Sequence, residues 1–193
     1  MLMMRDYYLN LEVEAAHYLY MLVPNLIDLF PVAKFILSVR EPRSWLESEI
    51  NMNLKTAGGG LWDEYQGFKY GKYSYPYESE YLEKNKYLYP ISSLLEYYKN
   101  HIKAVIDCVP DKWLLIIDMF SITTELDKIA SFAGVNKSNL NLEKEHVSKG
   151  KRRIYLREVV DKNVLYENIN EHCLTFIKIY VPFLKNRMDY LEQ

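Results

Sequence analysis

The sequence is poor in features that mark several protein classes. Its 193 residues include only two cysteines, Cys108 and Cys173, too few for a disulfide framework and without metal-ligand spacing. No apolar run approaches the ~20 residues of a membrane span. The first residues lack the basic and then apolar order of a secretory signal peptide. The formal net charge is −2, so no global field attracts nucleic acid. We therefore expect a single cytoplasmic domain over residues 1–193, with no metal, no nucleic-acid partner and no membrane span.

Glycine is scarce as well, and its distribution excludes one enzyme class. None of the seven glycines precedes Gly58, and no G-x-x-x-x-G-K-[ST] pattern occurs, which argues against a self-sufficient kinase or NTPase. Tyrosine, by contrast, is abundant, with 18 residues. Many of these lie between Tyr65 and Tyr98, where they either pack a hydrated surface or form an aromatic lid over a ligand. We expect residues 58–89 to form an irregular insertion with short helical pieces that shapes an acceptor pocket.

Three short apolar runs predict buried strands, and the segments between them have helical spacing. After the second run, Pro42 is suited to the first position of a helix that continues to the glycine run. A strand, a tight turn and a helix, followed by another strand, predict an α/β domain with a short parallel sheet. The expected strands are Leu9–Val13, Lys34–Val39 and Trp113–Ile117. Further helices are expected over 18–30, from Ser92 to about Val109, from Ser121 or Thr123 to a stop at Gly134, and over Lys162–Tyr180.

The most informative segment is Lys34–Ser48, which reads KFILSVREPRSWLES. Arg40 follows a buried strand, and Ser48 lies eight residues later in the expected helix. Ligands of open α/β sheets bind outside the carboxyl ends of the strands, and the planar donors of arginine suit phosphate. The pattern alone leaves a second interpretation open, in which Arg40 pairs with Glu41 or Glu47 at the surface.

This segment resembles the 3′-phosphate-binding motif of the P-loop sulfotransferases, which use 3′-phosphoadenosine 5′-phosphosulfate (PAPS). In that family a strand ends in Arg, Pro follows two residues later and Ser eight residues later; here these are Arg40, Pro42 and Ser48. The resemblance extends to the Trp113–Met119 strand, the Ala-Ser-Phe-Ala-Gly-Val helix end and residues 142–151. It implies a P-loop NTPase-like three-layer α/β/α fold. It also implies metal-independent sulfuryl transfer from PAPS to a hydroxyl or amine of a small-molecule or glycan acceptor, releasing adenosine 3′,5′-bisphosphate.

The resemblance also suggests further site residues. The family's late Arg-Lys-Gly loop matches a stretch of the basic loop 144–157 in which Ser148 replaces the arginine, so Lys149 and Gly150 would close over the 3′-phosphate. A solvated basic loop is the alternative. The catalytic base of the family lies before the motif arginine, and His17 or Glu14 would take this role here.

One defining element of the family is not found in the sequence. No glycine-containing phosphosulfate loop lies between a strand and a helix before Arg40, so we expect an N-terminally truncated sulfotransferase-like domain. The alternative is a catalytically inactive, truncated homologue that acts as an interaction subunit or is a remnant. Its uncovered sheet edge would bind a second copy or an N-terminal partner segment. A transferase that uses another nucleotide-linked donor remains a third hypothesis.

Overall fold

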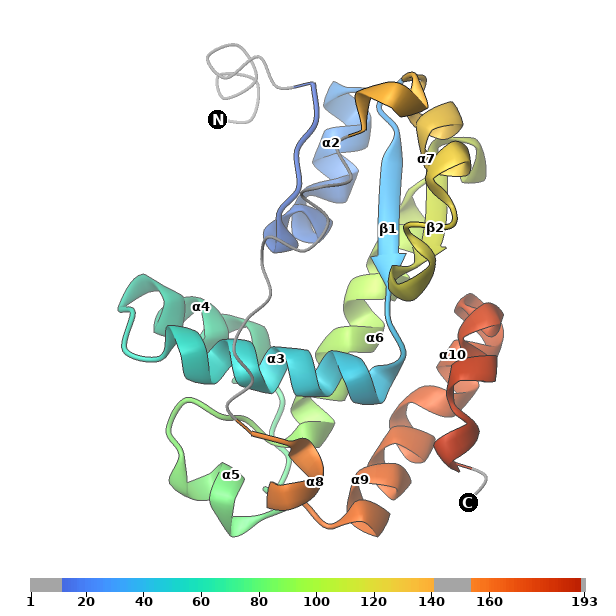
Figure 1. Cartoon of the computed structure of the whole chain (residues 1–193). Coiled ribbons are helices and arrows are strands. Elements are labelled where there is room, and N and C mark those ends of the chain that lie inside the picture. The colour runs from blue at the N-terminus through green and yellow to red at the C-terminus, as the bar shows by residue number, and fades with distance from the viewer. Residues whose placement is uncertain (1–11, 141–153, 192–193) are drawn as a thin grey trace.

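A computed structural model describes residues 12–140 and 154–191 and shows a mixed α/β protein built around a short sheet. The two strands, β1 (Phe35–Val39) and β2 (Leu114–Asp118), are parallel, and Val39 lies opposite Asp118. Both strands point toward the end of the molecule where α3 begins and α10 lies (Figure 1). The carboxyl ends of the strands therefore meet at one edge, next to helices from distant parts of the chain.

Helices make up most of the remaining described residues. The α-helices are α2 (Val23–Leu29), α3 (Pro42–Thr56), α4 (Leu61–Tyr70), α5 (Glu80–Lys84), α6 (Ile91–Cys108), α7 (Leu126–Ala133), α8 (Leu156–Val159), α9 (Lys162–Ile169) and α10 (Thr175–Tyr180). A π-helix, Asn170–Leu174, joins α9 to α10. Short 3-10 helices cover His17–Leu22, Asp111–Trp113, Met119–Ser121, Lys137–Asn139, Pro182–Arg187 and Asp189–Leu191.

The long helix α6 lies at the centre of the core. Its apolar side chains recur every three or four residues, so they form one buried stripe. The helix contacts α2, α3, α4, α9, α10 and β1, and it brings two buried tyrosines, Tyr97 and Tyr98, into the interior. Tyr70 of α4 is fully buried beside Tyr97, with ring centroids 5.1 Å apart. Some of the abundant tyrosines are thus core residues, which neither sequence-based interpretation anticipated.

Local sequence signals predicted several of these elements correctly. The strands β1 and β2 and the helices α3 and α6 lie within about a residue of their expected bounds. Gly134 ends α7 with a φ of 82°, a left-handed conformation that favours glycine.

Two sequence-based predictions need correction. The helix expected from Ser121 or Thr123 begins only at Leu126, because the Asp118 carboxylate holds Met119–Ser121 in a 3-10 turn. The structure does not describe residues 9–11, but Glu12 and Val13 of the expected first strand are exposed and form no strand. In the described residues, β1 pairs only with β2.

The two cysteines lie in contrasting environments. Cys173 is buried, and burial raises its pKa to about 12, whereas Cys108 is exposed. The thiolate is the reactive form. We expect an aromatic disulfide reagent at a pH of about 8 to modify one thiol per native chain and two in denaturant. Cys108→Ser should abolish the native reaction, and rapid modification of that variant would contradict the burial of Cys173.

No helix in residues 12–140 or 154–191 combines the length and the hydropathy that a membrane crossing requires.

Candidate functional site

Arg40 lies at the carboxyl end of β1, directly before α3. Its carbonyl oxygen accepts a hydrogen bond of 2.7 Å from the Tyr98 hydroxyl of α6. Because Tyr98 is almost fully buried, this bond anchors the strand–helix junction to the core. The backbone from which the Arg40 side chain projects is therefore held from both sides, by the sheet and by α6.

The Arg40 guanidinium retains hydrogen-bonding capacity. Its Nη1 lies 3.5 Å from the Ser44 carbonyl oxygen, at the limit of a hydrogen bond, and its Cζ lies 5.2 Å from the centre of the Phe120 ring. The Nε atom is buried and has no hydrogen-bond partner among the described residues. A buried N–H group without a partner is unfavourable, so an acceptor at this position would relieve the penalty. The side chain is thus suited to an anion.

Ser48, the second residue of the motif, lies exposed on α3. It follows Ser44 by four residues, so the two lie on the same side of the helix. The Arg40 guanidinium reaches the backbone of Ser44, and Ser48 lies one turn farther along. Ser48 therefore lies one helical turn beyond the residue whose carbonyl oxygen Arg40 approaches.

Glu41 stabilises the start of α3. Its carboxylate, 4% exposed as a residue, accepts hydrogen bonds from the backbone N–H groups of Arg43 (2.9 Å) and Ser44 (2.6 Å) and from the Tyr190 hydroxyl (2.8 Å). An acidic cap also matches the positive end of the helix dipole. The contacts of this carboxylate are those of a helix cap, unlike the surface ion pair that the pattern left open.

Arg187 reaches the same edge of the sheet, which no motif in the sequence predicted. Its Nε forms an ion pair with the Asp118 carboxylate at the end of β2, and its Nη2 lies 3.3 Å from the Ser121 hydroxyl oxygen. Its Cζ also lies 5.2 Å from the centre of the Phe120 ring. Two guanidinium groups therefore contact one half-exposed phenyl ring, and the Asp118 carboxylate offsets the charge of Arg187.

The structure describes only some of the other predicted site residues. His17 begins the 3-10 helix that precedes α2. Glu14 lies three residues earlier in the chain, and its carboxylate is 3.5 Å from the Tyr18 hydroxyl. Lys149 and Gly150 lie outside the described residues.

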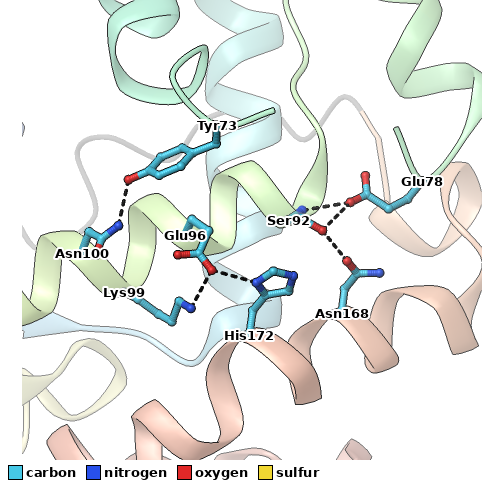
Figure 2. Close-up of polar contacts among 8 residues, drawn as sticks. All are labelled: Tyr73, Glu78, Ser92, Glu96, Lys99, Asn100, Asn168 and His172. Atoms are coloured by element: carbon cyan, nitrogen blue, oxygen red, sulfur yellow. Dashed lines mark hydrogen bonds and ion pairs between the residues drawn. The ribbon is translucent and has the colours of Figure 1, made fainter. Parts of the chain in front are cut away.

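A polar cluster connects the C-terminal helices to α6 (Figure 2). His172 of the π-helix lies 2.9 Å from Glu96, which also pairs with Lys99 at 2.6 Å. Burial raises the pKa of Glu96, but the hydrogen bonds from Lys99 and His172 outweigh it, and the net shift is downward. The His172 side chain is only 10% exposed. Its contacts support a structural role.

A second buried polar cluster joins α3 to α4. Glu49 of α3 accepts a hydrogen bond from the Tyr70 hydroxyl and pairs with the Lys69 ammonium at 2.9 Å. Lys69 is 2% exposed, and its Nζ lies 4.6 Å from the centres of both the Tyr70 and Tyr97 rings. Burial lowers the pKa of Lys69, and Glu49 opposes this shift. The pair fixes the position of α4 against α3.

Of the comparisons with known proteins, only the one with family models found a match. No curated protein and no solved structure matches the chain. Within the described residues, no group of three or more His, Cys, Asp or Glu side chains is arranged to hold a metal ion. A family model described as a sulfotransferase domain matches residues 5–141, which include Arg40, Ser48 and Phe120, whereas Arg187 lies beyond the match. Because this match covers most of the chain, the protein belongs to the sulfotransferase domain family.

Proposed function

We propose that this protein binds PAPS through Arg40 and transfers its sulfuryl group to a hydroxyl or amine of an acceptor. Family membership supports sulfuryl transfer in general. The buried Nε of Arg40, without a partner among the described residues, is the observation that supports an anionic donor at this edge. In this proposal the two strands belong to a P-loop NTPase-like three-layer sheet domain.

The donor-binding residues have distinct roles in the proposal. Arg40 donates hydrogen bonds to the 3′-phosphate, and the Ser48 hydroxyl adds another. Arg187, paired with Asp118, lies over the same Phe120 ring as Arg40 and supports that ring beside the donor site. Lys149 and Gly150 complete the site from the basic loop. Arginine suits a phosphate ester because its donors form a planar fork.

The reaction requires one proton acceptor. As the acceptor oxygen or nitrogen attacks sulfur, a new bond to sulfur forms and the bond from sulfur to the bridging phosphate oxygen breaks. Adenosine 3′,5′-bisphosphate leaves with the bonding electrons, and the acceptor's proton passes to His17 or Glu14. Variants at these two positions would show which residue is the base. Replacing the base should abolish sulfuryl transfer without weakening donor binding, whereas replacing the other residue should leave transfer intact.

Retention on an adenosine 3′,5′-bisphosphate resin tests the donor site. We expect the protein to bind the resin and Arg40→Ala to weaken binding by about 10- to 100-fold, the range for a lost hydrogen bond to a charged group. Arg40→Lys should bind at an intermediate level, because it keeps the charge and loses the fork. Lys112→Ala, which removes an exposed cation at the opposite end of β2, is the control. Equal retention of the wild type and Arg40→Ala would contradict the proposal.

Transfer of labelled sulfate from PAPS is a separate measurement. It is needed because the family's phosphosulfate loop, which has no counterpart among these 193 residues, stabilises the leaving group. Donor binding together with transfer to an acceptor supports the enzyme. Donor binding without transfer to any of a broad acceptor set would favour the alternative, a catalytically inactive homologue.

A further inference from the structure

A small pocket lies between α3, α4 and the segment that precedes α6. Its volume is about 200 Å³, and its wall includes Asn53 of α3, Trp62 and Gln66 of α4, and Tyr87 and Tyr89. At about 30 Å³ per water molecule, this volume holds six or seven waters. It is smaller than the ~300 Å³ at which pockets for drug-sized ligands begin. The pocket is therefore of a size for a single six-membered ring with its substituents.

The polar groups in this wall have an unusual environment. Asn53 is 2% exposed and Gln66 is 4% exposed. The nitrogen and oxygen atoms of both carboxamides, and the indole Nε1 of Trp62, are buried without a hydrogen-bond partner in the described part of the chain. Buried polar atoms in folded proteins nearly always have partners, so five such atoms on three residues that line one pocket favour a polar occupant there.

The surrounding structure holds these groups in place. Asn53 follows Glu49 by four residues on α3, and Gln66 precedes Tyr70 by four residues on α4. Each amide therefore lies one turn from the buried cluster in which Glu49 contacts Lys69 and Tyr70. Asn53 and Gln66 thus lie on two helices that a buried ion pair joins. This connection favours a preformed site.

The chemistry of the wall indicates the kind of ligand. A carboxamide both donates and accepts hydrogen bonds, as a hydroxyl group does, so two carboxamides suit a ligand with neighbouring hydroxyls. The indole N–H adds a donor, and the rings of Trp62, Tyr87 and Tyr89 offer apolar faces to the C–H groups of such a ligand. Asp63 and Lys86 also line the pocket and add one acceptor and one donor.

We propose that this pocket binds a single sugar ring through the Asn53 and Gln66 carboxamides and the Trp62 indole. The same helix, α3, begins beside Arg40 and carries Asn53, so it connects the pocket with the candidate donor site. The assignment of this sugar as the sulfuryl acceptor rests on the proposed function. The binding of the sugar does not.

Saturation-transfer NMR with free monosaccharides tests the pocket without any donor. The probes are glucose, galactose, N-acetylglucosamine and glucuronic acid, with adenosine and cyclohexanol as comparison ligands. We expect at least one sugar to bind with a Kd of about 1 mM, as is reasonable for a ligand of so few atoms. Asn53→Leu and Gln66→Leu should each weaken binding at least about tenfold, which corresponds to the loss of one good hydrogen bond to the ligand.

Thermal unfolding of the same variants provides a second readout. Because leucine removes polar atoms that lack partners, Asn53→Leu and Gln66→Leu should match or exceed the wild-type Tm without sugar. Trp62→Phe keeps an aromatic ring and removes only the donor, so it should weaken sugar binding several-fold in a folded protein. Asn186→Leu, at an exposed position, is the matched control and should bind as the wild type does.

Three results would overturn the proposal. The first is that no sugar binds at concentrations of about 50 mM, far above the expected Kd. The second is that sugar binding persists in both leucine variants. The third is that adenosine binds in an Asn53-dependent way and the sugars do not, which would identify a nucleobase subsite. Sugar binding with no retention on the bisphosphate resin would reject the proposed donor site and leave the pocket intact.

Discussion

Replacing Glu49 with leucine is expected to lower the free energy of unfolding by about 3–5 kcal/mol, the usual cost of breaking a buried ion pair from one side. The variant leaves the Lys69 ammonium, 2% exposed, without its carboxylate. The Tyr70 hydroxyl, which also donates to Glu49, loses its acceptor. Urea unfolding followed by circular dichroism measures the change.

A double variant separates the pair interaction from packing. Glu49→Leu with Lys69→Met removes both charges, so it should recover most of the stability lost in the single variant. Glu80→Leu is the matched control, because Glu80 pairs with Lys84 at the surface, where both side chains are more than 70% exposed. We expect the control to change stability by less than about 1 kcal/mol. A Glu49→Leu effect as small as that of the control would contradict the buried pair.

Replacing Glu41 with alanine is expected to destabilise the protein by about 2–4 kcal/mol, the sum of a lost helix cap and a lost buried hydrogen bond. The carboxylate accepts from the backbone N–H groups of Arg43 and Ser44 at the first turn of α3 and from the Tyr190 hydroxyl. Thermal unfolding should show a lowered Tm. Because Glu41 follows Arg40 directly, retention on the bisphosphate resin should also fall.

Two further variants calibrate this effect. Tyr190→Phe keeps the helix cap and removes one donor, so its effect should be smaller, about 1 kcal/mol. Glu83→Ala, at an exposed position of α5, should stay within about 0.5 kcal/mol of the wild type. If Glu41→Ala were no more destabilising than Glu83→Ala, the cap would not hold the start of α3.

Local signals explain which elements were predictable. The apolar runs before Arg40 and after Asp111 form strands that bury alternate side chains, and Pro42 begins α3 because its fixed φ fits a first helical turn. The predicted start of α7 was wrong because contacts of Asp118, which local sequence patterns do not reveal, determine the preceding turn. Asp118, bonded to the backbone N–H of Phe120 and to Arg187, determines the turn after β2.

The sequence by itself determined the strand–helix junction that presents Arg40 and Ser48, and with it the family, because both depend on residues a few positions apart. Tertiary structure alone decided that Arg187 shares Phe120 with Arg40 and that the carboxamides of Asn53 and Gln66 line one pocket. Contacts of this kind depend on how helices pack around the core, and neither periodicity nor capping residues specify which side chains then meet.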